Sequence, residues 1–396
     1  MECMRYIARD LARRIAAHLG RGKSVLLFGP RQTGKTTLVG RLPADMRLSL
    51  VPPEVRQRYE RAPAQLSAEI EALRTRHRAK RPIVVLDEVQ RVPALLDVVQ
   101  DAIDRKLARF VLTGSSARKL RRGGSVNLLP GRVVTLRLDP LNLRERPEPN
   151  LRSLLLHGSL PGIRAEPSNA GREIDLRSYV ETYLEEEVRA EALVRNVGTF
   201  ARFLELAGLE SGNIVSFRAL SQELGIAHTT VAGFYEILED CLVAERVDPL
   251  TRSRTRKKLT KSSRYLIFDL GVRRLCANEG TRPHRDRLGQ LFEQFVGLEL
   301  IRQSRSAASE TRVLFWRDPD GPEVEWIVEH GEELLPVEVK WTDAPGARDA
   351  RHVETFLNEY REARRGFIVC RAPRPVRISK RVTALPWQEL GSVLPA

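Results

Sequence analysis

The sequence predicts an α/β protein whose N-terminal part is a doubly wound parallel sheet. Short apolar runs at residues 25–28, 83–86 and 110–112 end in glycine or polar residues, and helix-like stretches follow them. Apolar runs that alternate with helical segments are typical of buried parallel strands with crossover helices. A second α/β region is indicated at residues 323–341, where apolar and polar residues alternate in two successive strands.

The composition bounds the size and the charge of the protein. A chain of 396 residues is long enough for two or three domains with cores of their own. Its 66 Lys and Arg residues exceed its 51 Asp and Glu residues, which gives a net charge of +15. Such a surplus favours a polyanionic partner, with nucleic acid as the first candidate. A solvated, arginine-rich surface is the alternative.

Cysteine usage and hydropathy predict a cytoplasmic protein. Cys3, Cys241, Cys276 and Cys370 are far apart and form no CxxC pair, which argues against a disulfide framework or a structural zinc site. No apolar run approaches the length of about 18 residues that a membrane span needs. The first 20 residues carry charge throughout and predict a basic amphipathic helix instead of a signal peptide.

The first apolar run leads into a phosphate-binding loop. Gly29, Gly34, Lys35 and Thr36 stand at the spacing G-x-x-x-x-G-K-T, after a strand and before a helix. Glycines let backbone amides wrap phosphate oxygens, and the helix adds the positive end of its dipole. We therefore expect ATP and Mg²⁺ as cofactors, with Lys35 on the outer phosphates and Thr36 on the metal. The expected nucleotide contacts are Gly29, Pro30, Arg31, Gln32, Thr33, Gly34, Lys35, Thr36 and Thr37.

The ends of the next two apolar runs carry candidate catalytic groups. Asp87 and Glu88 follow the second run, where Asp87 would hold magnesium through water and Glu88 would polarise the attacking water. An adjacent acidic pair is otherwise typical of a solvated loop. Ser115 follows the third run and could sense the γ-phosphate, because ligands gather at the carboxyl ends of parallel strands.

Arg132 is a candidate arginine finger. It lies just ahead of the last predicted core strand and could reach the nucleotide of a neighbouring subunit. The alternative is an ordinary arginine at a strand edge, and Arg118, Arg121 and Arg122 are rivals for the catalytic role.

Four segments together resemble one family. The stretches GPRQTGKTTL, LDEVQRVPALL, LTGSSARKL and GRVVTLRLDPLNLRE are similar to those of bacterial and archaeal AAA-type P-loop ATPases. The resemblance covers nearly the whole chain. It implies an AAA-type P-loop domain over residues 1–145, a helical connector with a winged helix over 146–280, and an α/β restriction-endonuclease-like domain over 281–396. It also implies a homo-oligomer, for which a hexameric ring is one form.

The middle of the chain has the rhythm of a helix-turn-helix. Ser216 is expected to cap one helix and Gly225 to make the turn before the second. The second helix ends in EILED and offers no basic side chain, which argues against readout of base edges. A basic segment follows: Arg252, Arg254, Arg256, Lys257, Lys258, Lys261 and Arg264. It predicts sequence-nonspecific phosphate contacts, with a solvated loop as the alternative.

The C-terminal strands carry a pattern that resembles the PD-(D/E)xK nuclease signature. Glu325 precedes Glu338, Lys340 follows, and Glu293 on the preceding helix would be the helix carboxylate. Glu325 and Glu338 could bind Mg²⁺, and Lys340 could orient water or contact nucleic acid. A solvated sheet edge, or a retained fold without cleavage, would show the same pattern.

These observations predict an ATP-hydrolysing AAA-type ATPase that couples hydrolysis to binding or remodelling of duplex or branched DNA. Two alternatives stay open. One is a nucleotide-gated signalling or assembly switch with a protein partner, and the other is a metal-dependent nuclease that ATP licenses.

Overall fold

The computed structural model describes residues 6–76, 81–115, 129–184, 197–252, 259–307, 311–319 and 321–394. The chain divides into two compact units. The first comprises residues 1–139 with 240–242, and the second comprises residues 140–239 with 243–396. Each unit is described by itself.

The first unit is built on a parallel sheet. Its strands are β1 (Ser24–Phe28), β2 (Met46–Ser49), β3 (Ile83–Asp87), β4 (Arg109–Gly114) and β5 (Val133–Arg137), in the order β2-β3-β4-β1-β5. Every neighbouring pair is parallel. The predicted α/β class with a parallel sheet is therefore confirmed. Because β4 lies between β1 and β3, its carboxyl end lies beside both the loop after β1 and the acidic pair at the end of β3.

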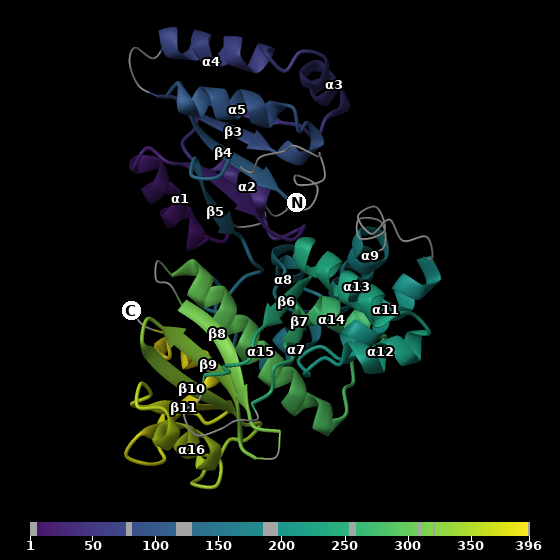
Figure 1. The fold of residues 1–396 in the computed structure, drawn as a ribbon, viewed down its shortest axis with the longest axis vertical. Coiled ribbons are helices and arrows are strands. Elements are labelled where there is room, and N and C mark those ends of the chain that lie inside the picture. The colour runs from purple at the N-terminus through teal and green to yellow at the C-terminus, as the bar shows by residue number, and fades with distance from the viewer. Residues whose placement is uncertain are drawn as a thin grey trace. The chain divides into compact units, whose positions relative to one another are not determined.

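Helices cover both faces of this sheet (Figure 1). Val25 and Leu27 of β1 pack with α1 and α2, whereas Leu26 and Phe28 pack with α3, α4 and α5. This alternation follows from the pleat of a strand, which sends successive side chains to opposite faces. The helices are α1 (Leu11–Gly20), α2 (Lys35–Gly40), α3 (Pro53–Arg61), α4 (Gln65–Arg76) and α5 (Leu95–Asp104), with a short 3₁₀ helix, η1 (Val89–Arg91).

The second unit begins with helices. They are α7 (Leu151–His157), α8 (Pro161–Ala165), α9 (Asn169–Ser178), the π-helical η2 (Tyr179–Leu184), α11 (Val197–Leu209), α12 (Phe217–Leu224), α13 (His228–Asp240) and α14 (Leu270–Cys276). The strands β6 (Ala244–Val247) and β7 (Arg264–Ile267) pair antiparallel. As expected, the Ser216 side chain accepts a hydrogen bond from the Ala219 amide at the start of α12. Gly225 takes a left-handed conformation (φ 66°) between α12 and α13.

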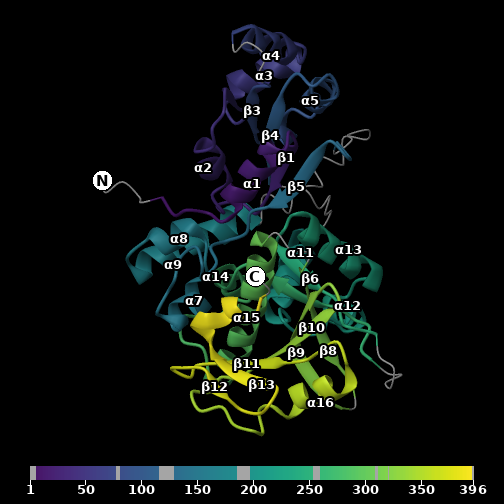
Figure 2. The ribbon, with the colours of Figure 1, turned by 90° about the vertical axis from the view of Figure 1, so that its left-hand side faces the viewer.

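A mixed sheet completes the second unit. Its strands are β8 (Thr311–Arg317), β9 (Glu323–His330), β10 (Glu333–Val339), β11 (Gly366–Cys370), β12 (Val376–Arg377) and β13 (Val382–Pro386), in the order β12-β13-β11-β10-β9-β8. The predicted hairpin is present, since β9 and β10 pair antiparallel. The helix α15 (Arg285–Ser306) packs on one face, and α16 (Arg351–Glu359) packs on the other (Figure 2). The 3₁₀ helix η3 (Trp387–Ser392) follows β13.

Among the helices in the described ranges, none is both long enough and apolar enough to cross a membrane.

Candidate active site

The loop after β1 is tightly packed against the sheet. A methyl group added at Gly29 would come within 2.4 Å of the Leu138 carbonyl oxygen, so only glycine fits there. Gly34, just before α2, has a φ of 91°, a conformation that side chains rarely adopt. Buried Thr33 donates its hydroxyl to the Pro30 carbonyl at 2.8 Å. The predicted nucleotide residues Gly29 to Thr37 thus form a compact loop and the first turn of α2.

Lys35 lies folded over this loop. Its ammonium donates to the carbonyls of Gly29 at 2.7 Å and Pro30 at 2.9 Å. The side chain is buried, with 5% of its surface exposed. The cation is therefore held at the centre of the loop, where a phosphate group would meet it.

Thr36 and Asp87 meet across the sheet edge. The Thr36 hydroxyl donates to Asp87 Oδ2 at 3.0 Å, although the two residues are 51 positions apart. A hydroxyl and a carboxylate are oxygen ligands of the kind that Mg²⁺ prefers, with water and phosphate completing the shell. These residues therefore fit the magnesium that the loop motif implies.

Thr113 at the end of β4 connects the acidic pair. Its hydroxyl donates to Asp87 Oδ1 at 2.5 Å and accepts the Glu88 amide at 3.0 Å. Glu88 has φ 61° and ψ 48°, a left-handed conformation that is uncommon for a residue with a side chain. Strain of this kind gathers at functional sites when the surroundings enforce it. Fully buried Thr113 is one such enforcing contact.

Gln90 holds the Glu88 side chain. Its amide donates to Glu88 Oε2 at 2.5 Å and to the Ser115 hydroxyl at 3.2 Å. Ser115 has only 1% of its surface exposed. Gln90 thus links the side chains of Glu88 and Ser115, and the expected role of Ser115 at the γ-phosphate stays a prediction.

Arg9 supports the loop from outside the motif. Its guanidinium donates to the Thr33 carbonyl at 2.6 Å and to the Asp139 carbonyl at 2.7 Å, and the residue is buried. Sequence reasoning missed Arg9, Gln90 and the bridging role of Thr113. The sequence could have indicated Gln90 and Thr113. Gln90 lies two residues after Glu88, and Thr113 lies two residues before Ser115.

Arg132 lies at the amino end of β5, whereas the loop lies at the carboxyl ends of the strands. It makes a two-pronged ion pair with Asp104, with nitrogen–oxygen distances of 2.7 and 2.9 Å. This pairing lowers the pKa of the Asp104 carboxyl. Its role as a finger stays a prediction, and its rivals Arg118, Arg121 and Arg122 lie outside the described residues.

The C-terminal carboxylates come together around two cations. Arg264 on β7 pairs with Glu293 at 2.9 Å and with Glu325 at 3.3 Å. Lys340 pairs with Glu338 at 2.5 Å. In the ranges that the structure describes, no group of three or more His, Cys, Asp or Glu side chains is arranged to hold a metal ion. The carboxylates that were expected to bind Mg²⁺ thus face cations of the chain itself.

Burial changes the acidity of these groups. Burial, followed by the negative charge of Glu325, raises the pKa of Glu338 to about 8. The same two causes raise the pKa of Glu293 well above its ordinary value, against the opposing charge of Arg264. The Glu338 Oε2 atom is buried and lacks a hydrogen-bond partner within the described part of the chain.

The basic segment is only partly described. Arg254, Arg256, Lys257 and Lys258 lie outside the described residues. Arg252 is exposed and pairs with Glu329, and Lys261 is exposed. Arg264 corrects the expectation, because it is buried (4% exposed) and stacks over Phe315 instead of extending toward solvent.

Comparisons with known proteins divide the chain into three parts. A family model described as an AAA domain matches residues 21–146, which contain the loop and the acidic pair. Two models described as domains of unknown function, DUF8612 and DUF4143, match residues 148–282 and 288–390. The AAA match agrees with the geometry above and supports an ATPase of the P-loop type.

Two mycobacterial proteins are similar to this chain over most of their length. The chain is 27% identical to the uncharacterized protein Rv2008c of Mycobacterium tuberculosis, over 99% of this chain and 87% of the relative. The uncharacterized protein Mb2031c of Mycobacterium bovis matches to the same extent. Among solved structures, protein VC1899 of Vibrio cholerae aligns over 93% of this chain and 96% of its own, with 10% identity and a TM-score of 0.19.

Proposed function

We propose that this chain is a magnesium-dependent ATPase that couples hydrolysis to binding or remodelling of DNA. The observation that carries the ATPase part is the 3.0 Å contact between the Thr36 hydroxyl and Asp87, beside Lys35 in its loop. Folding alone brings together this hydroxyl, on the first turn of α2, and the carboxylate at the end of β3. The AAA match over the same residues supports the proposal.

Each residue of the site has a distinct part. Lys35 would exchange its bonds to loop carbonyls for bonds to the outer phosphates of ATP. Thr36 and Asp87 would hold magnesium, which supplies charge neutralisation on the phosphates. Glu88 would orient and deprotonate the attacking water once its side chain leaves Gln90. Thr113 fixes the positions of Asp87 and Glu88 relative to each other.

The coupling to DNA is supported by charge and by the order of elements. The helices α12 and α13 and the β6–β7 hairpin follow one another as in a winged helix, and we propose that fold for this part. The exposed cations Arg252 and Lys261, the neighbouring Arg254, Arg256, Lys257 and Lys258, and Lys340 would contact phosphates without sequence preference. We also propose the division into domains at residues 1–145, 146–280 and 281–396, with a restriction-endonuclease-like fold for the last.

The test is steady-state ATP hydrolysis with single-stranded DNA, duplex DNA and a four-way junction. We expect one DNA form to stimulate hydrolysis, and the stimulation to fall steeply with salt as counterion release requires. Glu88→Gln should lower kcat by at least about 100-fold while ATP still binds, because only the water-activating group is lost. If no DNA binds or stimulates at low salt, the coupling proposal fails and a switch with a protein partner takes its place.

The second candidate is a nuclease, which the meeting of Glu325, Glu338 and Lys340 favours. Against it, Arg264 and Lys340 take up the charge of these carboxylates. The same reactions, run on a gel with Mg²⁺, decide between the two. Cleavage that Lys340→Ala abolishes would establish the nuclease, and intact DNA in every lane would exclude it.

A further inference from the structure

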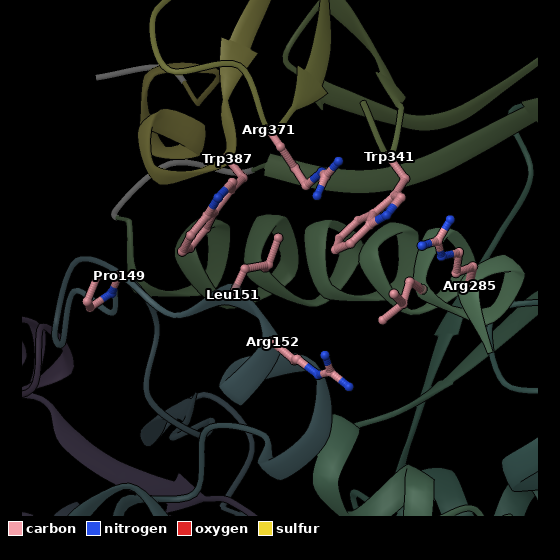
Figure 3. Close-up of a pocket in the computed structure, with 8 residues that line it drawn as sticks. Pro149, Leu151, Arg152, Arg285, Trp341, Arg371 and Trp387 are labelled. Atoms are coloured by element: carbon pink, nitrogen blue, oxygen red, sulfur yellow. The ribbon is translucent and has the colours of Figure 1, made fainter. Parts of the chain in front are cut away.

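The second unit contains a pocket of about 690 Å³ that the ATPase chemistry does not use. It is lined by Pro149, Leu151, Arg152, Arg285, Leu288, Trp341, Arg371 and Trp387 (Figure 3). Its volume lies within the range of about 300–1,000 Å³ that is usual for small-molecule sites. Its lining combines aromatic rings and leucines with guanidinium groups, and contains no carboxylate.

The pocket lies at the carboxyl ends of three parallel strands. The strands β10, β11 and β13 are neighbours, and their register pairs Val339 with Val369 and Cys370 with Pro386. Continuing this register places Trp341, Arg371 and Trp387 in one row just past the strand ends. The Arg371 amide donates to the Thr342 carbonyl at 2.7 Å, which shows that the ladder continues there. Ligands of open α/β sheets bind at such edges.

The aromatic side chains of the row are fixed in place. Phe292 meets the Trp341 ring edge-on, with centroids 5.5 Å apart, and Phe295 meets Trp387 in the same way at 5.9 Å. Both phenylalanines are buried on α15. The guanidinium of Arg371 lies over the Trp341 ring, 4.3 Å from its centroid. A flat ligand would therefore meet preformed surfaces and would not have to order them.

Arg152, Arg285 and Arg371 are exposed and come from α7, α15 and the end of β11 (Figure 3). Within the described residues, none of the three makes an ion pair with a carboxylate. Many other arginines of this unit do so, including Arg264, Arg274 and Arg305. Three cations around one pocket repel one another unless an anion binds between them. The pocket is thus poised for an anion that carries a planar apolar group.

We propose that this pocket binds a nucleotide unit of a single nucleic-acid strand. The base packs on the wall formed by Trp341, Leu288 and Leu151, and phosphates bind to the arginines. Base stacking on aromatic rings combined with basic side chains along the backbone is the general mode of single-strand binding. Three guanidinium groups from three elements are more than a single phosphate needs, which favours a strand over a nucleoside monophosphate. The proposal rests on the coupling to nucleic acid proposed above.

Tryptophan fluorescence offers a direct readout. The chain has four tryptophans, Trp316, Trp326, Trp341 and Trp387, so the ATPase unit has none. Two of them line the pocket, and the other two are fully buried. The titration would use the full chain with Lys35→Ala, to suppress binding at the ATP site. The probes are a thymidine oligonucleotide, thymidine monophosphate, inorganic phosphate and polyglutamate.

We expect the oligonucleotide to quench the fluorescence at concentrations where the other probes do not. Arg152→Ala with Arg285→Ala should weaken oligonucleotide binding at least about tenfold, and should reduce the slope of log affinity against log salt by about 1.4, or about 0.7 per lost phosphate contact. Trp341→Leu should weaken binding to a similar degree, whereas Trp341→Phe retains a stacking surface. Arg364→Ala is the matched control, because Arg364 is also exposed but lies ahead of β11, at its amino end.

Several outcomes would overturn the proposal. One such outcome is oligonucleotide binding that fluorescence anisotropy detects, but that causes no tryptophan quenching and that Arg152→Ala with Arg285→Ala does not weaken. The strand then binds elsewhere on the protein, and the coupling to DNA survives. Equal or tighter binding of thymidine monophosphate would make this a free-nucleotide site, and equal quenching by polyglutamate would make it a site for acidic peptide. If no nucleic acid binds at low salt, the pocket proposal and the coupling to DNA both fail.

Discussion

The Thr113 hydroxyl contacts both residues of the acidic pair, for which we propose catalytic roles. It donates to Asp87 and accepts the amide of Glu88, whose left-handed backbone has to be held. A buried group that loses its partner costs about 1–3 kcal/mol. A side chain of the same shape without the hydroxyl should therefore disturb the metal ligand and the water-activating group together.

We predict that Thr113→Val lowers kcat at least about tenfold, because a small misplacement of a positioned group costs that much or more. Thr113→Ser keeps the hydroxyl and should remain close to the wild-type rate. Steady-state hydrolysis at saturating ATP and Mg²⁺ makes the comparison. Equal rates for the valine and serine variants would show that the bridge has no catalytic weight.

Arg9 acts on the loop from a distance in sequence. Its two donors fix the carbonyls of Thr33 and Asp139. We predict that Arg9→Met raises the KM for ATP about tenfold with a smaller change in kcat, since the loop loses its preorganised shape. Arg13→Met is the control, because Arg13 is exposed on α1. An unchanged KM in Arg9→Met would refute this role.

At the scale of elements, β10 carries a buried carboxyl that makes stability depend on pH. Burial and the negative charge of Glu325 raise the pKa of Glu338 in the folded state to about 8, from an ordinary value of about 4.5. Below about pH 4.5, the Glu338 carboxyl is protonated in both the folded and the unfolded state. Its contribution to the free energy of unfolding is then fully present. As the pH rises toward 8, Glu338 ionises in the unfolded chain before it ionises in the folded protein. The free energy of unfolding therefore falls, by something on the order of a few kcal/mol.

We predict that the second unit unfolds at lower urea concentration at about pH 9 than at about pH 5, and that Glu338→Gln reduces this difference. Tryptophan fluorescence reports the transition, since every tryptophan lies at residues 316–387. The same pH dependence in wild type and variant would assign it to other groups.

The elements also show which features of the site the sequence could reveal. Lys35 and Thr36 were predictable, because a strand, a loop and a helix that are contiguous in sequence position them. The contact from Thr113 to Asp87 depends on β4 lying between β1 and β3, which is a pairing between distant segments. Arg264 was misassigned for a related reason. Its sequence neighbours are basic, whereas its partners Glu293 and Glu325 come from α15 and β9.

At the scale of the whole molecule, the position of Arg132 bears on assembly. It lies at the amino end of β5, whereas the loop after β1 lies at the carboxyl end of the strands, and it pairs with Asp104. We propose a homo-oligomer, for which a hexameric ring is one form, in which Arg132 serves a neighbouring site. The ion pair with Asp104 would then orient the Arg132 guanidinium. Alternatively, the guanidinium would leave Asp104 to bind a phosphate of the neighbouring subunit's nucleotide.

We predict that ATPase activity per chain rises with protein concentration and reaches a plateau on assembly. Arg132→Ala should lower the plateau rate by at least about 100-fold. An arginine finger raises kcat by about 10³-fold or more, so this threshold allows for some residual stabilisation. Arg105→Ala is the control, because Arg105 is also an arginine that pairs with a carboxylate, and it lies just after α5. Wild-type hydrolysis by an assembled Arg132→Ala protein would remove Arg132 from the mechanism.

The glycine that opens the ATP loop has a consequence for evolution. Gly29 must be small for a reason separate from phosphate binding, because the Leu138 carbonyl fills the space of a side chain. A descendant of this protein that lost ATP binding altogether would still be selected for glycine there, as long as β5 kept its place. Gly20 and Gly40 have open space around them and are free to drift. Glycine at this position therefore shows that the packing of β1 against β5 is retained. It does not show that a protein still hydrolyses ATP.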